Sequence, residues 1–343
     1  MSDEKIKVTI KDVAVRAGVS LGTVSNYLNG KVRVSKKTSE KIEKAIKELN
    51  YVPDLVASSL RRKDSKEIYI LIPDIKNTFY TEIISEFSSY AKSYGFIIYT
   101  VYFGQKAEHE KEKLDRLMTA KEGTYIIIFN GYDDEKEIKN LIDSGKNIIL
   151  ADRGDRIAGA SNIEFDNQRV MYDIADLVKE RGYQTIMFFS GLTEKMYNIR
   201  QRKRNLIKAF ESRNLEIDEK DICITGECCS DALGAGYKQM QYMLQNREEK
   251  DYPDCILATS DYLAIGLLRA CYDLGYRVPE DFAILGFDDI TLSDYSYPRL
   301  TTVRQDQKMF AEKLWNIVEN IYKNGSQEEH IELAQKLIIR ESC

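Results

Sequence analysis

The stretch TIKDVAVRAGVSLGTVSNYLNG, residues 9–30, joins two short amphipathic segments at Ala17-Gly18-Val19. Thr9 and Asp12 have the spacing of a capping box, which predicts that a helix begins here. The apolar face of this helix repeats at helical spacing and consists of Ile10, Val13, Ala14 and Ala17. Gly18 is suited to end the helix, because glycine adopts a positive φ at little cost.

A second helix is expected to begin after Ser20, which is a favourable N-cap residue. Its inward side chains should be Val24, Tyr27 and Leu28, which leaves Leu21, Gly22, Thr23 and Asn26 facing outward. Two helices joined by such a short turn form a helix-turn-helix unit, whose second helix enters the DNA major groove by its N-terminal end. The small side chains at this end allow a close approach to the bases.

Residues 35–50, SKKTSEKIEKAIKELN, predict a third helix that closes a small core through Ile42, Ala45, Ile46 and Leu49. An ordinary helical hairpin would explain any one of these helices, whereas three capped helices favour a DNA-binding domain over residues 1–50. Pro53 then ends the helical pattern, and residues 51–65 are interpreted as a short helix and a charged linker. The sequence around Leu60 by itself would indicate only a leucine packed against its neighbours.

The charge distribution agrees with a DNA-binding head. Residues 1–66 carry 15 basic and 8 acidic side chains, a net charge of +7, and the rest of the chain therefore carries −12. A basic head on an acidic body indicates that only the head meets a polyanion. A Lys-rich solvated surface would give the same asymmetry if charge were the only observation.

The composition excludes other classes of protein. The sequence has 43% hydrophobic residues but no long apolar run, and its N-terminus MSDEKIKVTI is charged, so we expect a cytoplasmic protein without membrane contact. The 6 cysteines lack a paired CxxC spacing, and the chain has only 2 histidines, so we expect reduced thiols, no metal and no cofactor.

The body alternates short apolar runs with helical patterns. EIYILIPDI, GFIIYTVYF, TYIIIFNG and NIILADRG predict one series of strands, and TIMFFSG, DICITGE, DCILATSD and FAILGFDD predict a second. The alternation predicts an α/β core of two subdomains, each a parallel sheet flanked by helices. Ligands of such sheets bind beyond the carboxyl ends of the strands.

Polar and aromatic residues fall at these strand ends. They are Phe79, Tyr80, Asp152, Ser260, Asp261 and Asp288, and Arg202 follows on a helix. Carboxylates, an arginine and aromatic faces suit a polyhydroxylated ligand such as a sugar. Each Asp taken alone is as well explained as a helix cap or loop residue, but their recurrence at equivalent strand ends favours a shared pocket.

These motifs together resemble the lactose repressor family of bacterial transcription regulators. The matching residues are the opening stretch, VS..T...I..AI.ELNYVP, VASSL, NTFYTEI, GYDDEKEI, DYLAIGLLRACYDLGYRVPEDFAILGFDD and PRLTTVRQD, almost end to end. The resemblance implies a periplasmic-binding-protein-like core over residues 66–343. It places the N-subdomain at about 66–164 and 291–322, and the C-subdomain at about 165–290 and 323–343.

The resemblance also implies roles for individual residues. Residues 53–60 would form a hinge helix in which Leu60 wedges into the minor groove of a palindromic operator. The implied DNA-binding set is Thr9, Ser20, Leu21, Gly22, Thr23, Ser25, Asn26, Asn29, Leu60 and Arg61. The effector-binding set is Phe79, Tyr80, Asp152, Arg202, Ser260, Asp261, Asp288 and Gln305, of which Phe79, Asp152, Arg202, Asp288 and Gln305 match effector-contacting positions of the family.

Three departures from the family pattern bear on specificity. Asn26 stands where Arg or His is frequent, and asparagine suits adenine better than guanine. Gly226-Glu227-Cys228 lacks the aromatic residue that often covers the ligand, and Met196 stands where purine-responsive members have arginine. A sugar effector is therefore favoured over a purine.

We expect a homodimeric repressor controlled by a small molecule, since the chain ends at LIIRESC without a heptad segment for tetramerisation. A regulator whose core binds a protein co-regulator, or a non-sugar effector such as a nucleoside, is the main alternative. An enzyme is disfavoured because no G-x-S-x-G, P-loop or G-x-G-x-x-G motif occurs. A solute-binding protein would explain the body but not the head.

Overall fold

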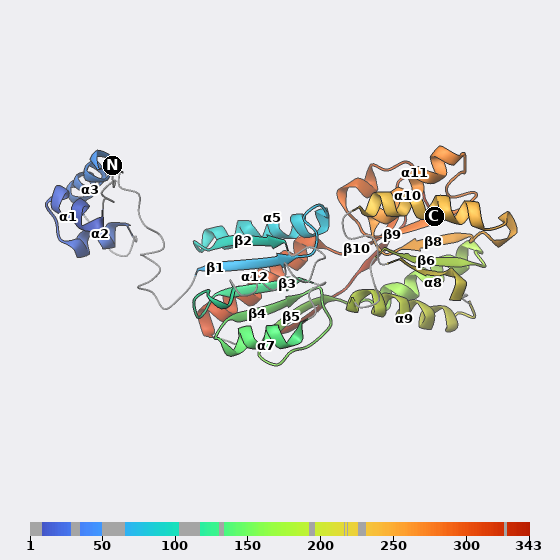
Figure 1. Cartoon of the computed structure of the whole chain (residues 1–343), viewed down its shortest axis with the longest axis horizontal. Coiled ribbons are helices and arrows are strands. Elements are labelled where there is room, and N and C mark those ends of the chain that lie inside the picture. The colour runs from blue at the N-terminus through green and yellow to red at the C-terminus, as the bar shows by residue number, and fades with distance from the viewer. Residues whose placement is uncertain are drawn as a thin grey trace, which may run out of the picture. The chain divides into compact units, whose positions relative to one another are not determined.

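The computed structural model describes residues 9–28, 35–49, 66–102, 117–129, 134–191, 196–215, 217, 219–225, 231–325 and 328–343. The chain forms two compact units, Met1–Asp64 and Ser65–Cys343, which we call the head and the core. Figure 1 shows helices in the head and two sheets with flanking helices in the core.

The head contains α1 (Ile10–Ala17), α2 (Leu21–Leu28) and α3 (Lys36–Glu48). Their buried side chains form one cluster of Val13, Ala14, Ala17, Val24, Ile42 and Ala45. Ion pairing adds contacts at the rim, where Arg16 Nη2 lies 2.6 Å from Glu48 Oε2. The three helices expected from the sequence are therefore present, with boundaries close to those predicted.

The helix caps are those that the sequence indicates. Asp12 Oδ2 accepts hydrogen bonds of 2.7 Å from both the backbone N and Oγ1 of Thr9, and these bonds lower the pKa of the Asp12 carboxyl. Gly18 ends α1 at a φ of 66°. Ser20 Oγ accepts from Thr23 N at 3.1 Å and so caps α2, and Ser35 Oγ accepts from Thr38 N at the start of α3.

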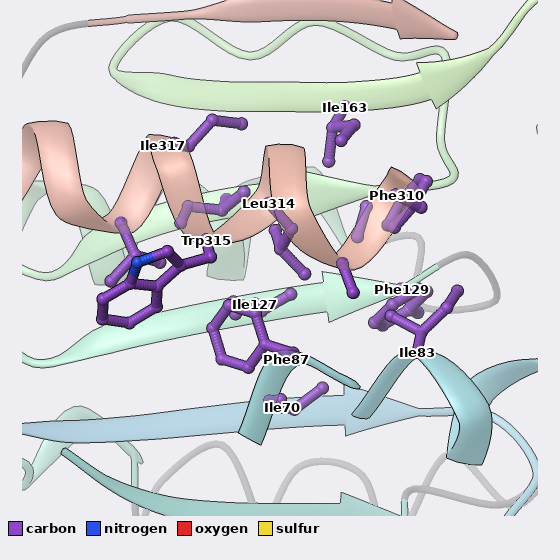
Figure 2. Close-up of a cluster of buried hydrophobic side chains, with 14 of the residues drawn as sticks. Ile70, Ile83, Phe87, Ile127, Phe129, Ile163, Phe310, Leu314, Trp315 and Ile317 are labelled. Carbon is purple, nitrogen blue, oxygen red and sulfur yellow. The ribbon is translucent and has the colours of Figure 1, made fainter. Parts of the chain in front are cut away.

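The first lobe of the core contains a sheet in the order β11-β5-β4-β3-β1-β2, and all its neighbouring strands are parallel. The strands are β1 (Glu67–Ile72), β2 (Ile97–Tyr102), β3 (Tyr125–Phe129), β4 (Asn147–Ala151), β5 (Ala160–Phe165) and β11 (His330–Leu333). One face packs on α5 (Thr78–Ser93) and α12 (Gln307–Asn324), and the other on α7 (Glu135–Asp143). Figure 2 shows Phe87 of α5 and Leu314 of α12 in the first of these clusters.

The second lobe contains a sheet in the order β12-β10-β9-β8-β6-β7. Its strands are β6 (Ile186–Ser190), β7 (Ile222–Ile224), β8 (Cys255–Ala258), β9 (Ala283–Asp288), β10 (Thr301–Arg304) and β12 (Lys336–Ile338). Helices α8 (Arg169–Arg181) and α9 (Tyr197–Glu211) cover one face, and α10 (Ala232–Asn246) and α11 (Asp261–Leu274) cover the other. Short 3-10 helices lie at Glu219–Asp221, Glu249–Asp251 and Thr291–Asp294.

Two features of the core differ from the sequence expectations. Strand β12 runs antiparallel to β10, so the second sheet is not wholly parallel. The subdomain limits also differ, because β10 pairs with β9 in the second lobe and β11 pairs with β5 in the first. Segment 291–322, expected in the N-subdomain, therefore contributes β10 to the second lobe. Segment 323–343, expected in the C-subdomain, contributes β11 to the first lobe. β11 and β12 are short strands at sheet edges with alternating polar residues, and such a pattern does not indicate which sheet a strand joins.

Candidate functional site

In the head, the N-terminal end of α2 carries the residues expected to read DNA. Ser20 and Gly22 are exposed, and Leu21 and Thr23 are half-buried. A Cβ atom added at Gly22 would meet only Ser20 Oγ, at 3.8 Å, so the surface is open there. Val24, one residue further along, is fully buried and anchors the helix in the head core.

Residues of the rest of the head support α2 or lie outside what the structure describes. Tyr27 Oη donates a 2.6 Å hydrogen bond to Glu43 Oε1 of α3, which fixes the far end of α2 and raises the pKa of the Tyr27 hydroxyl. Thr9 caps α1 and is exposed. The side chains of Ser25 and Asn26, and all of Asn29, Leu60 and Arg61, lie outside the described residues.

In the core, two aspartates end strands of different lobes. Asp152 follows β4 and Asp288 ends β9, and both are buried. Both have backbone conformations that are unusual for residues other than glycine, with φ of 52° at Asp152 and 119° at Asp288. Backbone strain of this kind is common where side chains are held for function.

Arg202 of α9 is only 3% exposed. Burial lowers the pKa of its guanidinium, and the charges of Asp288 and Asp152 oppose this shift. Its guanidinium donates to neutral acceptors, which are Asn167 Oδ1 at 3.1 Å, Thr259 O at 2.9 Å and Gln305 Oε1 at 3.3 Å. Its Cζ lies 3.7 Å from the ring centroid of Phe287. The buried cation is thus positioned by amides, a carbonyl and an aromatic face.

The pKa shifts of this cluster follow from burial. Burial raises the pKa of the Asp152 carboxyl to about 6, although Arg202 and a hydrogen bond from Asn198 oppose the shift. Burial also raises the pKa of Asp288 well above its ordinary value, and the Asp261 carboxylate adds to this effect. Burial raises the pKa of the Tyr80 hydroxyl well above its ordinary value, and the nearby charges of Asp152 and Asp288 raise it further.

Two buried polar atoms of the cluster have no hydrogen-bond partner among the described residues. They are Asn198 Oδ1, an acceptor, and Gln305 Nε2, a donor. Both residues are already bound to the cluster by their other atoms, Asn198 to Asp152 and Gln305 to Arg202. Because unsatisfied buried polar atoms are costly, a bound ligand that both donates and accepts would stabilise this arrangement.

Two of the expected effector residues, Asp261 and Ser260, form structural hydrogen bonds, although Asp261 still lies close enough to raise the pKa of Asp288. Asp261 is fully buried and accepts hydrogen bonds from Ile290 N at 2.9 Å, Ser293 Oγ and Thr302 Oγ1. It therefore fixes β10 and the 290–293 segment. Ser260 caps α11 by accepting from Leu263 N.

Phe79 belongs to the apolar core rather than to the polar cluster. Its ring lies 5.2 Å from the Tyr80 ring and 6.4 Å from the Phe165 ring, measured between centroids. The residues that the structure brings together are therefore Tyr80, Asp152, Arg202, Asp288 and Gln305.

Sequence reasoning missed Asn198 and Asn167. Asn198 stands one helical turn before Arg202 on α9, so its i, i+4 relation to that arginine was the available signal. Asn167 lies in the segment that joins the two lobes, and no local pattern marks it. The five residues 226–230, which include the glycine, glutamate and cysteine named above, lie outside the described residues.

The structure holds no indication of metal chemistry or membrane insertion in its described part. There, no group of three or more His, Cys, Asp or Glu side chains could hold a metal ion. Across the same residues, every helix is too short or too polar to span a lipid bilayer. The cysteines within those ranges, Cys223, Cys255, Cys271 and Cys343, are free thiols.

Comparisons with known proteins find relatives of both the head and the core. Residues 9–54 match the model of bacterial regulatory proteins of the lacI family, and residues 175–343 match a periplasmic binding protein-like domain. The HTH-type transcriptional regulator RegA of Clostridium saccharobutylicum is 31% identical over 338 residues, which cover 97% of this chain and 98% of RegA. The HTH-type transcriptional repressor PurR of Vibrio vulnificus (strain CMCP6) is 28% identical over 97% of this chain and 98% of PurR.

A solved structure has the same fold along almost the whole chain. The crystal structure of the Lac repressor dimer bound to operator and the anti-inducer ONPF superposes with a TM-score of 0.80 at 24% identity, covering 98% of each chain. A helix-turn-helix head joined to a two-lobed core defines a class of DNA-binding transcription regulators. This chain belongs to the lacI family of bacterial regulatory proteins.

Proposed function

We propose that the protein is a homodimeric transcriptional repressor that binds a palindromic operator and is controlled by a sugar or sugar derivative bound between the lobes of the core. DNA binding is assigned to the N-terminal end of α2, assisted by Leu60 and Arg61 of the hinge segment. The open surface at Gly22 and the basic head support this part of the proposal.

The observation that carries the effector assignment is the buried cluster of Asp152, Arg202 and Asp288 with its unsatisfied donor and acceptor. Sugar hydroxyls both donate and accept hydrogen bonds, so one ligand can satisfy Gln305 Nε2, Asn198 Oδ1 and the carboxylates together. A purely anionic ligand would be repelled by two buried aspartates, and a purely cationic one by Arg202.

The same cluster favours a small molecule over a protein co-regulator as its partner. Tyr80, Asp152, Arg202 and Asp288 are each at most 7% exposed, so a protein surface could not reach them. Met196, the buried residue before α9, offers no polar group to a purine, which supports a sugar over a nucleoside. Effector binding at the lobe junction would then change the lobe orientation and the DNA affinity of the dimer.

A thermal-shift screen of the full chain against sugars, sugar phosphates, nucleosides and purines tests the effector assignment. A sugar should raise the Tm of the wild type and of Arg200→Ala, an exposed control on α9, but not that of Arg202→Ala or Asp288→Ala. Stabilisation by a nucleoside alone would replace the sugar by the nucleoside alternative. Stabilisation by none of the compounds would contradict a small-molecule effector of these classes.

Selection of operator sites from random DNA, followed by analytical ultracentrifugation, tests the DNA and dimer assignments. We expect the selected sites to be inverted repeats, and the protein–DNA complex to contain two chains per site. Recovery of single, asymmetric half-sites bound by one chain would contradict the homodimer.

A further inference from the structure

A second polar pocket lies beside the segment that joins β5 to α8, and the proposed sugar site does not use it. Its volume is about 380 Å³, which is within the range of small-molecule sites. Arg156, Glu164 and Glu332 line it from the first lobe, and Gln201, Arg204 and Lys208 line it from α9 of the second. Both lobes therefore supply its walls.

The wall from the first lobe carries a pair of adjacent carboxylates. Glu164 of β5 and Glu332 of β11 are register partners on neighbouring parallel strands. Side chains directly opposite each other on one face of a sheet interact, and like charges in this position are destabilising. Burial, with Glu332 as the next cause, raises the pKa of Glu164 to about 7, and Arg156 opposes this only in part. Arg156 on the same wall therefore compensates the two carboxylates only in part.

The wall from the second lobe carries the opposite charge. Arg204 and Lys208 stand one turn apart on α9, so their side chains share one face of the helix. Within the described part of the chain, neither residue forms an ion pair. The pocket thus has two carboxylates that Arg156 compensates only in part on one side, and two cations without an ion pair on the other.

Further closure of the lobes would not bring these charges together. Tyr197 of α9 already packs on Gly154 of the first lobe, where an added Cβ atom would lie 1.7 Å from the tyrosine ring. The lobes are in contact at this edge of the pocket, and both residues line it. The space between the walls is therefore set by this contact.

We propose that this pocket binds a small zwitterion, with its ammonium group between Glu164 and Glu332 and its carboxylate or other anionic group against Arg204 and Lys208. Such a ligand would neutralise both walls at once, and the amide of Gln201 would add a hydrogen-bond partner. A simple anion would neutralise Arg204 and Lys208 but not the carboxylate pair. A simple amine would neutralise the carboxylate pair but not the two cations.

The pocket is linked to the Arg202 cluster through Asn167. This residue lines the pocket, and its Oδ1 accepts the hydrogen bond from Arg202 Nε. Asn205 Nδ2, also from the pocket lining, donates to Asn167 O at 3.1 Å. Binding in the pocket would therefore alter the position of a group that orients Arg202, so the second ligand would change the affinity for the first.

The test uses ω-amino acids of increasing length, from glycine and β-alanine to γ-aminobutyrate and 6-aminohexanoate, with butyrate and butylamine as the separate halves. Isothermal titration of the full chain should detect binding of at least one ω-amino acid and of neither half at the same concentration. Glu164→Gln and Arg204→Gln should each weaken that binding by about tenfold or more, whereas Glu211→Gln, on the exposed end of α9, should leave it unchanged.

The pH dependence provides a second readout. The ammonium group requires an ionised Glu164, whose surroundings are Glu332, Arg156, Asp152, Asp155 and Tyr197, with Arg204 and Lys208 across the pocket. Affinity should therefore rise from pH 6 to pH 8, with proton release on binding near pH 7. Affinity that rises as pH falls would indicate an anion site instead and overturn the proposal.

Two further results would overturn it. One is the absence of binding by every ω-amino acid, and the other is binding that persists unchanged in both Glu164→Gln and Arg204→Gln. Glu332→Gln serves as a second variant in case Glu164→Gln folds poorly. The result is independent of the sugar assignment, because Arg202→Ala tests the sugar site without removing either charged wall of the pocket.

Discussion

At the scale of single residues, two buried aspartates have different surroundings and, we infer, different roles. Asp152 has one clear hydrogen-bond donor, Asn198, and a neighbouring cation, whereas Asp261 accepts from three donors and fixes a segment of the second lobe. Burial raises the pKa of each carboxyl to about 6. The same chemical group therefore has different roles, and substitutions should distinguish them.

We expect Asp152→Asn to stabilise the ligand-free protein at pH 8 and to have little effect at pH 4. Because the folded pKa of about 6 exceeds the ordinary value of 3.8, the folded state binds the proton more tightly, and this stabilisation is lost as pH rises through 6. Two pKa units correspond to about 3 kcal/mol at most, so urea unfolding at pH 8 should show a gain of about 1–3 kcal/mol. An equal change at both pH values would contradict an ionised, destabilising Asp152.

We expect Asp261→Ala to destabilise the core by about 3 kcal/mol, because Ile290 N, Ser293 Oγ and Thr302 Oγ1 would lose their shared acceptor. Urea unfolding of the full chain measures this. The matched control is Ser260→Ala, which removes only the cap of α11 and should cost about 1 kcal/mol. Equal losses for both variants would show that the Asp261 network contributes little.

At the scale of elements, α10 and α11 pack so closely that glycine is required at their crossing. A Cβ atom at Gly236 would lie 2.1 Å from Leu263 O, and one at Gly266 would lie 2.1 Å from Leu233 O. Gly236 of α10 and Gly266 of α11 thus serve the packing of the two helices. Neither backbone oxygen can move without shifting its helix.

We expect Gly236→Ala to destabilise the second lobe by about 2 kcal/mol or more, because α10 and α11 must separate to admit the methyl group. Lys238→Ala, at an exposed position of α10, should change stability by less than about 0.5 kcal/mol. Thermal unfolding of both variants is the measurement. A Gly236→Ala protein as stable as the wild type would show that the helices adapt without cost.

At the scale of the whole molecule, charge and function divide between the units. The first 66 residues carry +7 and the remainder −12, so phosphate contacts are expected from the head alone. Specificity requires more than this charge, since non-specific DNA presents the same phosphates. In the proposed function, Leu60 of the hinge segment distinguishes the operator from non-specific DNA.

We expect Leu60→Ala to weaken operator binding by about tenfold or more, while non-specific DNA binding stays nearly unchanged, because a minor-groove wedge acts only on the bent specific site. Titrations of both DNAs at two salt concentrations measure the effect. Lys63→Ala, a charge-removing control in the same segment, should weaken binding to both DNAs alike. An equal loss on both DNAs for Leu60→Ala would rule out the wedge.

The sequence by itself determined the local features. The caps at Thr9, Ser20 and Ser35 and the positive φ of Gly18 follow from residue types three or four positions apart, and such spacings specify local backbone geometry. The placement of Asp152 and Asp288 at strand ends was equally predictable, because apolar runs mark buried parallel strands.

Tertiary structure decided the rest. It placed β10 and β11 in different lobes, made Asp261 an internal support and brought Asn167 to Arg202, 35 residues away in sequence. It also set Glu164 beside Glu332 and opposite α9. Such long-range neighbours depend on how sheets and helices pack, and a single sequence carries no periodic signal for them.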